Sequence, residues 1–504
     1  MKFKNVIMLA TSFVVFFGCE NNDDATPIPM VNTTVNFQYK TTISVGGEGA
    51  SEISAYDAIS KKLFTVNVES KQISVINISN LNAPVTETAI DLVAFGYPNS
   101  VAIFEGKLAV AVEADVKQNN GKILLYSTAD NSLLKQYTVG ALPDMVTFSK
   151  DGTLIISANE GEPNDDYTVD PLGSVSIIDL SDDTVTTLDF TAFNSQEATL
   201  EAQGFRVFGP GATLAEDVEP EYVTVSADSK TAWVSLQENN GIAKINLTSK
   251  TIEAIYPLGF KDYNLAANSI DASDKDGVTT LKNWPVFGMY QPDAITSVNI
   301  NGTEYIFSAN EGDSRDYSGF SEEERVKDLT LDETAFPVSS DFQSDINLGR
   351  LKTTNTMGNT DSDGDVDVIY SYGARSFSVW SGSGSLLYDS GNSIATETLN
   401  ATPDIFNGGD LRSDDKGAEP EAVEILNMGD QRYILFVGLE RNSQVMVYDV
   451  SNPIAPQFLT ILSHSGDAGP EGLLVIPAID SPSGKDLLIV SNEVSGTVSI
   501  YENM

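Results

Sequence analysis

The sequence predicts an all-β protein folded as a seven-bladed β-propeller. Short runs of alternating apolar residues recur at near-regular spacing, and Gly, Asn, Asp and Ser separate them. Hardly any segment has helical periodicity. The runs align into seven copies of one four-strand unit, which is the pattern of a propeller blade.

The clearest copy of the repeat begins at Leu142. Its expected strands are 142–149, 153–160, 173–180 and 184–190. Further copies begin near Ile53, Ser100, Tyr222, Ala294, Ala422 and Gly472. In three of these copies the expected second and third strands are 62–69 with 72–79, 107–113 with 121–127, and 485–493 with 496–501.

The last copy has three expected strands before residue 504. Residues 36–46 read as a strand without a partner nearby in the sequence, so we expect this N-terminal strand to close the last blade. Long insertions in several blades are expected, chiefly at 191–218, 259–290 and 312–370.

The N-terminus predicts export. Two lysines precede an apolar run, 6–17, that is too short to span a bilayer, and Gly18-Cys19 follows. The end of this segment resembles the lipobox of bacterial lipoproteins, in which the cysteine is acylated; the alternative is a secreted protein with a chance cysteine. We expect a signal peptide over 1–18, a flexible tether over 19–35 and a single propeller domain over 36–504, anchored by lipid at Cys19 to the outer membrane, surface-exposed or facing the periplasm.

The composition excludes several classes of function. The chain has 72 acidic and 29 basic residues and a net charge of -43, which excludes nucleic-acid binding and limits bilayer contact to the acyl anchor. One histidine, His464, and one cysteine exclude a Cys/His zinc site, a Cys-His nucleophile and an internal disulfide. We expect His464 to be exposed and the protein to be a monomer. Any metal must use oxygen ligands, which favours Ca²⁺ over Mg²⁺.

Two columns of polar residues run through the repeat. Each expected second strand ends in a glutamate: Glu69, Glu113, Glu160, Glu238, Glu311, Glu440 and Glu493. The residue before each innermost strand is acidic or asparagine: Glu52, Asn99, Asp144, Glu221, Asp293, Glu421 and Glu471. Both columns should meet at one mouth of the central channel, where close carboxylates raise one another's pKa or bind cations. Alternatively, each glutamate of the first column accepts backbone N–H bonds from a neighbouring loop or blade.

Some acids occur in only a few blades and are therefore better candidates for a unique site. Two copies carry Ser-Ala-Asn-Glu-Gly followed by an acid, at 157–162 and 308–313. Another segment alternates aspartates around Gly364 as calcium loops do, although Tyr372 stands where an EF-hand needs glutamate. The predicted metal ligands are Asp361, Asp363, Asp365, Asp367, Glu160, Glu162, Glu311, Asp313, Asp293, Glu421 and Glu471.

With these residues in view, the chain resembles the choice-of-anchor I family, the bacterial relatives of mesenchyme-specific cell-surface glycoproteins. The resemblance covers nearly all of 40–504 and lies in 157–163 with 165–180, 308–315, 363–365 with 373–377, and 412–417 followed by 419–421 and 438–441. It implies an extracytoplasmic propeller held by different anchors in different proteins, with a calcium-linked role. Family members often carry the label alkaline phosphatase, but the standard form of that enzyme needs several zinc-binding histidines, which this sequence lacks.

Two functions fit the sequence. The first is a lipid-anchored calcium-binding propeller that acts as a binding, adhesion or scaffold module for an unknown surface ligand. The second is a calcium-dependent phosphohydrolase acting on a phosphate ester, in which Ca²⁺ activates water and Arg315 or Arg375 neutralises the developing charge. Either arginine could equally pair with carboxylates. A compact basic cluster beside the acids would favour the second function, and lysine and arginine are scattered along the sequence.

Overall fold

The computed structural model describes residues 34–504. The predicted signal peptide, Cys19 and nearly all of the predicted tether lie outside these described residues. Strands dominate the described range, as predicted for an all-β protein.

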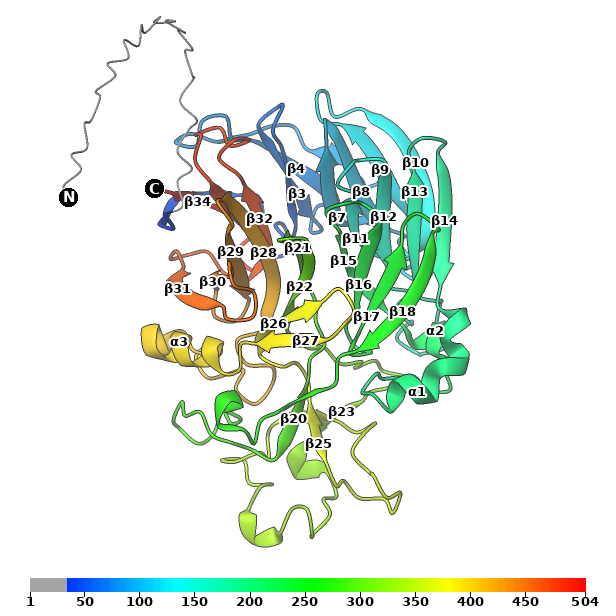
Figure 1. Cartoon of the computed structure of the whole chain (residues 1–504), viewed down its shortest axis with the longest axis vertical. Coiled ribbons are helices and arrows are strands. Elements are labelled where there is room, and N and C mark those ends of the chain that lie inside the picture. Colours follow the sequence, from blue (N-terminus) through cyan, green and yellow to red (C-terminus); the bar gives the residue numbers. More distant parts are fainter. Residues whose placement is uncertain (1–33) are drawn as a thin grey trace, which may run out of the picture. The chain divides into compact units, whose positions relative to one another are not determined.

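Seven of the eight sheets in the described range repeat a four-strand antiparallel pattern, and we call these the blade sheets (Figure 1). The first contains β2 (Ser54–Asp57), β3 (Lys62–Asn67) and β4 (Gln72–Asn77), with β5 (Val85–Thr86) and β6 (Ile90–Asp91) both paired to β4. The second contains β7 (Tyr97–Phe104), β8 (Lys107–Glu113), β9 (Asn120–Ser127) and β10 (Leu133–Ala141). The third contains β11 (Pro143–Phe148), β12 (Leu154–Asn159), β13 (Ser174–Asp179) and β14 (Thr184–Asp189).

The remaining blade sheets follow the same order. The fourth contains β15 (Pro220–Val225), β16 (Thr231–Leu236), β17 (Gly241–Asn246) and β18 (Thr251–Pro257). The fifth contains β21 (Ile295–Ile300), β22 (Thr303–Asn310), β26 (Ser376–Ser381) and β27 (Leu386–Asp389). The sixth contains β28 (Pro420–Gly429), β29 (Arg432–Leu439), β30 (Gln444–Asp449) and β31 (Gln457–Leu462). The seventh contains β32 (Pro470–Ile476), β33 (Leu487–Asn492), β34 (Thr497–Asn503) and β1 (Phe37–Ser44).

Burial differs between the strands of one blade sheet in the way face-to-face packing requires. Every residue of β12 and β33 is buried, whereas β14 has mostly exposed side chains. Middle strands are covered on both faces by neighbouring sheets, and their sequences are therefore nearly continuous apolar runs. The core lies between adjacent blade sheets, for example where Phe64 and Val66 of the first sheet share a cluster with Leu108 and Val110 of the second.

The first strands of the blade sheets contact one another in a closed cycle. In order they are β2, β7, β11, β15, β21, β28 and β32, and β32 contacts β2 again. This arrangement is that of a β-propeller, in which the first strands surround a central channel.

The predicted exchange between the first strand and the last sheet is present. β1 pairs antiparallel with β34, so that Phe37 lies opposite Asn503 and Ser44 opposite Thr497. The pairing covers the outer edge of the seventh blade sheet, because β1 occupies the position of its fourth strand.

The predicted insertions form structure of their own outside the blade sheets. Segments 259–290 and 312–370 together build a five-stranded sheet of β19 (Phe260–Asp262), β20 (Val286–Met289), β25 (Ile369–Ser371), β24 (Lys352–Thr354) and β23 (Glu323–Arg325). β20 and β25 pair in parallel, and Figure 1 shows them apart from the blade strands β3 and β8. The 3-10 helices η2 (Ala266–Asn268), η3 (Val326–Asp328) and η4 (Val338–Ser340) belong to the same insertions.

Short helices also occur, although the sequence has little helical periodicity. Segment 191–218 folds into η1 (Thr191–Gln196), α1 (Glu197–Glu201) and α2 (Leu214–Asp217). α3 (Ser393–Ala401) and η5 (Pro403–Ile405) precede β28. α3 buries only Ile394 and Thr398, four residues apart on one face, and so narrow an apolar face gives a weak sequence signal.

Candidate functional site

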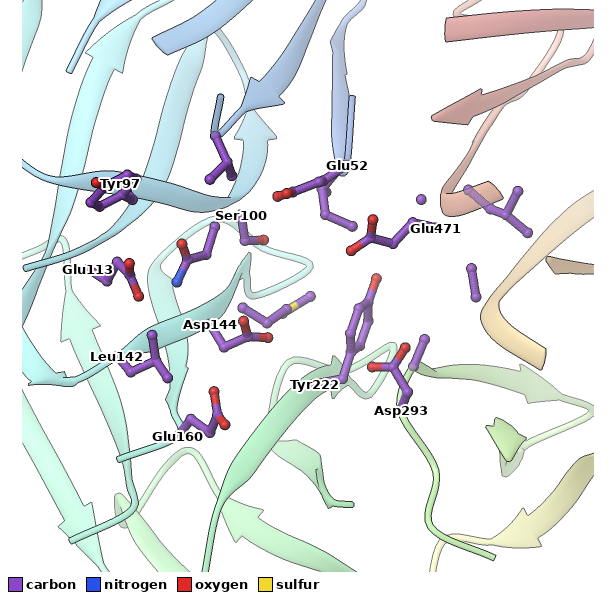
Figure 2. Close-up of a pocket in the computed structure, with 18 of the residues that line it drawn as sticks. Glu52, Tyr97, Ser100, Glu113, Leu142, Asp144, Glu160, Tyr222, Asp293 and Glu471 are labelled. Carbon is purple, nitrogen blue, oxygen red and sulfur yellow. The ribbon is translucent and has the colours of Figure 1, made fainter. Parts of the chain in front are cut away.

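A cavity of about 620 Å³ lies within the ring of first strands. Figure 2 shows the carboxylates of Glu52, Asp144, Asp293 and Glu471 directed toward this shared space. Each stands at or just before the beginning of a first strand, here β2, β11, β21 and β32. The repeat therefore brings acids that are far apart in the sequence to the same mouth of the channel, as predicted for this column.

The acids of this column lack direct polar partners in the part of the chain that the structure describes. Within residues 34–504, no hydrogen bond or ion pair reaches the carboxylates of Glu52, Asp144, Glu221, Asp293, Glu421 and Glu471. Oε2 of Glu421 is a buried acceptor without any partner. We call these six residues the channel acids. Asn99 holds the seventh position, and its amide donates to the Pro143 carbonyl at 3.3 Å.

Burial and mutual repulsion raise the pKa of every channel acid. Burial is the largest cause, and neighbouring carboxylates add to it. The pKa of Glu52 rises to about 8 and that of Asp144 to about 7. The pKa values of Glu221, Asp293, Glu421 and Glu471 lie well above the ordinary value. Near neutral pH, Glu52 and Asp144 would therefore hold protons or bind cations, and the same causes act on the other four acids.

The glutamates that follow the second strands do not act as one column. Glu113 and Glu160 line the same cavity as the channel acids. Glu69, in contrast, is exposed and accepts the backbone N–H of Gly47 at 3.0 Å, while Glu440 pairs with Arg441 at 2.6 Å. The expectation that all seven would gather at the channel mouth is corrected for Glu69, which a neighbouring loop holds. Glu440 keeps a carboxylate oxygen within 4.8 Å of Glu311 and so stays near the mouth.

Three acids at the channel mouth are close enough to share a cation. Carboxylate oxygens of Asp293, Glu311 and Glu421 lie within 4.8 Å of one another, and we call these residues the mouth triad. Glu311 is the one member with partners, since it pairs with Lys416 and accepts a hydrogen bond from Gln237 at 3.0 Å. The sequence predicted all three acids but neither partner.

The other acids of the two Ser-Ala-Asn-Glu-Gly copies lie in different surroundings. Glu162 pairs with Lys117 at 2.9 Å and accepts the Tyr317 hydroxyl at 3.1 Å. Asp313 is half exposed and lies 3.6 Å from the Lys416 ammonium. Neither residue belongs to the mouth triad, so the structure does not join these two predicted ligands to Asp293.

The four aspartates of the predicted calcium loop do not form one group in the structure. Asp361 and Asp363 accept backbone N–H bonds from within the loop, at 3.3 Å and 3.2 Å, as short-range Asx turns do. Asp367 accepts the backbone N–H of Thr360 at 2.7 Å and, with Asp365, also meets Asp332, their carboxylate oxygens lying within 4.8 Å of one another. Oδ1 of Asp365 is buried without a partner among the described residues. Asp332 lies outside the aspartate-rich segment, so its spacing in the sequence could not reveal it.

The two arginines proposed for a phosphohydrolase bind other parts of the protein. Arg315 is 2% exposed and pairs with Asp217 and with Glu219, the latter at 3.0 Å. Arg375 donates to the carbonyls of Asp271, Ser413 and Asp415. The structure therefore favours the structural alternative for both, and neither lines the channel cavity.

Comparison with known proteins places the chain in a family. Residues 52–453 match the family model of the choice-of-anchor I domain. Gigasin-3a of Magallana gigas is 32% identical over 189 residues, covering 32% of this chain and 66% of that relative, so the chain spans slightly less than two thirds of its length.

The chain is also similar to solved structures, one of which supports the fold. The WD40 repeats of RRP9 match 93% of this chain and 100% of their own with a TM-score of 0.50 at 10% identity, a likeness that supports the propeller fold alone. Hydrazine synthase of Kuenenia stuttgartiensis matches 90% of this chain and 96% of its own, at 11% identity and a TM-score of 0.48. Among residues 34–504, no helix is both long and apolar enough to cross a membrane. The chain thus belongs to the choice-of-anchor I family, as its motifs predicted.

Proposed function

We propose that this chain is a seven-bladed propeller of the cell envelope that binds divalent cations, Ca²⁺ in preference to Mg²⁺, at the mouth of its central channel. The observation that carries the proposal is that four of the six channel acids, Glu52, Asp144, Asp293 and Glu471, line one cavity. None of the six has a hydrogen bond or ion pair to its carboxylate from residues 34–504. Lys117 is the one basic side chain in the described lining of that cavity. Cations from solution would supply the missing positive charge.

The donor set favours calcium. All candidate ligands are carboxylate oxygens, which hard cations prefer, and the sequence has too few histidines and cysteines for a zinc site. The mouth triad supplies oxygens from two adjacent blade sheets, near the starts of β21 and β28 and just after β22. Ca²⁺ tolerates such an irregular arrangement and takes six to eight ligands, whereas Mg²⁺ demands near-ideal octahedral geometry.

The triad alone would leave a bound Ca²⁺ with open coordination positions. Water or oxygen atoms of a second molecule could fill them, so a cation at this mouth would act as a bridge to a ligand. This open coordination supports the role of a binding, adhesion or scaffold module. We propose an unknown surface ligand as the partner and a monomer as the functional form.

We propose that the module is held to the outer membrane by lipid at Cys19. The chain matches the choice-of-anchor I domain, and the resemblance implies different anchors in different members; the lipobox-like segment would provide the anchor here. The net charge of -43 would keep the body of the protein away from anionic headgroups, which leaves the acyl chains as its one attachment.

The alternative function, a calcium-dependent phosphohydrolase, receives less support from the geometry. It requires a basic side chain near the cation to neutralise the developing charge. Arg315 and Arg375 are bound elsewhere. Lys416 contacts the mouth triad and belongs to a basic cluster with Lys352, Arg412 and Arg441, but each of these four bases is already paired with a carboxylate. We therefore prefer the binding module to the phosphohydrolase as the proposed function.

Thermal unfolding of the purified full-length protein in detergent tests the proposal. Ca²⁺ should raise the melting temperature more than Mg²⁺ or NaCl of matched ionic strength, because a site specific to the folded state adds about 2.7 kcal/mol at a hundredfold excess over Kd. The double variant Asp293→Asn, Glu421→Gln should lose most of this shift. Glu69→Gln, which changes an exposed glutamate of the repeat, is the matched control and should keep it. Equal shifts with Ca²⁺ and Mg²⁺ in all three proteins would end the calcium proposal.

A further inference from the structure

A second, smaller cavity of about 230 Å³ lies beside the mouth triad. Four basic side chains line it: Lys352, Arg412, Lys416 and Arg441. The whole chain has only 29 lysines and arginines among 504 residues, so this grouping is the compact basic cluster that could not be seen in the sequence. We propose that this cavity binds an oxyanion, the phosphate or sulfate group of a ligand.

A fully buried glutamate orients the two arginines. Glu419 is 0% exposed; its Oε1 accepts from Nε of Arg412 at 2.6 Å and its Oε2 from Nε of Arg441 at 3.0 Å. Its backbone has a φ of 53°, a conformation that non-glycine residues adopt rarely and at an energetic cost. A buried carboxylate that holds two guanidinium groups in fixed positions is a feature of preorganised sites.

Each arginine keeps a donor for a ligand. Nη1 of Arg412 pairs with Asp415 at 2.9 Å, and Nη1 of Arg441 pairs with Glu440 at 2.6 Å. Within residues 34–504, neither Nη2 group has a hydrogen bond or an ion pair. The planar guanidinium matches oxyanions well, since its N–H donors lie in a fixed fork.

The lysines add positive charge from other elements. Lys352 in β24 lies 2.9 Å from Glu323 and 3.3 Å from Asp415. Lys416 is largely buried, pairs with Glu311 and lies 3.7 Å from Glu419. The cavity thus combines bases from the insertion sheet, the segment before β28 and the loop after β29.

Binding of a cation should strengthen the oxyanion site. In the free protein the acids around the cavity offset its four bases, and Lys416 neutralises Glu311 of the mouth triad. A divalent cation at the triad would compete for Glu311, release the ammonium of Lys416 toward the cavity and add positive charge beside it. The two ligands should then raise each other's affinity by the same factor. This linkage rests on the proposed cation function, whereas the cavity itself does not.

The size of the cavity limits what it can hold. At about 230 Å³ it is smaller than the roughly 300–1,000 Å³ of sites that enclose a whole small molecule. It therefore suits one charged group, either a free ion or the ester group of a larger molecule whose remainder stays outside.

Calorimetric titration of the full-length protein in detergent with inorganic phosphate and with sulfate tests the site. We expect binding of at least one ion, tightened several-fold by Ca²⁺. The double variant Arg412→Gln, Arg441→Gln should weaken it tenfold or more, because each arginine contributes charge-assisted hydrogen bonds. Arg432→Gln is the matched control, since Arg432 of β29 pairs with Asp449 of β30 and does not line the cavity. If the double variant does not fold, the single variant Arg441→Lys replaces it in the test. This variant keeps the positive charge but lacks the fixed N–H donors of the guanidinium group, so it should still weaken binding.

The outcomes separate the two proposals. Ca²⁺ binding without binding of phosphate or sulfate overturns the oxyanion site and leaves the cation site standing. Oxyanion binding that Ca²⁺ does not change keeps the cavity and overturns the linkage. Affinity that is equal in the parent, the double variant and Arg441→Lys overturns the assignment to this cavity. Titration with a sugar phosphate, a sugar sulfate and the uncharged sugar then distinguishes an ester group from a free ion.

Discussion

The imidazole ring of His464 lies flat on the phenol ring of Tyr39, with ring centroids 3.6 Å apart and planes 1° from parallel. Tyr39 belongs to β1, and His464 follows β31 of the sixth blade sheet. Nδ1 of His464 also lies 3.1 Å from Asp467, a carboxylate that accepts the Thr42 hydroxyl at 2.9 Å. β1 is therefore held by the loop after β31 as well as by β34, and His464 is half-buried rather than exposed as expected.

Deleting residues 25–46 should lower the melting temperature and promote aggregation. The deletion removes β1, so β34 would present an unpaired edge and the stacking partner of His464 would be lost. Thermal unfolding and light scattering measure both effects. Deletion of 25–33 alone keeps β1 and is the control. A melting temperature unchanged by the longer deletion would refute the importance of the pairing.

The blade sheets could be predicted because their pattern is local and repeated. β12 and β33 are apolar runs bounded by turn residues, and seven aligned copies reinforce a signal that one copy leaves weak. The insertion sheet could not be predicted in this way. β24 has three residues, pairs with strands from distant segments and has no periodicity to align.

The candidate site likewise has residues that the sequence could predict and residues that it could not. Asp293 and Glu421 were found because both stand at the same position of the repeat. Lys416 contacts Glu311 across 105 residues of sequence, and Asp332 reaches Asp365 from outside its loop. Such long-range partners follow from the packing of the insertions, so one sequence without its structure does not reveal them.

Asp332→Asn and Asp365→Asn should each reduce Ca²⁺ binding to the acidic loop. The structure brings both carboxylates together with that of Asp367, whereas Asp361 does not belong to this group. Asp361→Asn is therefore the matched control and should change Ca²⁺ binding less. Calorimetry in the background of the Asp293→Asn, Glu421→Gln variant isolates this loop from the channel mouth. A larger loss from Asp361→Asn than from Asp332→Asn would favour the original calcium-loop interpretation.

Arg315→Met should destabilise the protein by about 3–5 kcal/mol, because it leaves the buried carboxylates of Asp217 and Glu219 without their partner. Denaturant unfolding measures the change. Lys230→Met removes an exposed lysine that lies 3.4 Å from Asp228 and should change the free energy of unfolding by less than about 1 kcal/mol. A fully stable Arg315→Met variant would contradict the structural role of this arginine.

Cys19→Ser should release the protein from the membrane. A diacyl anchor contributes roughly 0.8 kcal/mol per buried CH₂ group, and the acidic body offers no other attraction to a bilayer. Fractionation of cells that express the variant measures this. Ser12→Ala, a change within the predicted signal peptide that keeps the cysteine, is the control and should stay with the membrane. Retention of the Cys19→Ser variant there would overturn the lipid anchor.

Without cations, the protein should become less stable as the pH rises through neutrality. Burial raises the pKa of Glu52 to about 8 and of Asp144 to about 7, whereas carboxyl groups in an unfolded chain titrate near about pH 4. The folded protein therefore keeps protons that the unfolded chain has lost, so this contribution is complete below about pH 4 and disappears as the pH rises through the folded pKa values. Melting temperatures measured in EDTA should fall from about pH 5 to about pH 8.

Ca²⁺ should make this fall in melting temperature smaller by replacing the protons. Glu52→Gln should also reduce it, whereas the exposed control Glu69→Gln should leave it unchanged. A flat profile in EDTA would show that the channel acids stay ionised in the folded protein and would remove the electrostatic basis for cation binding.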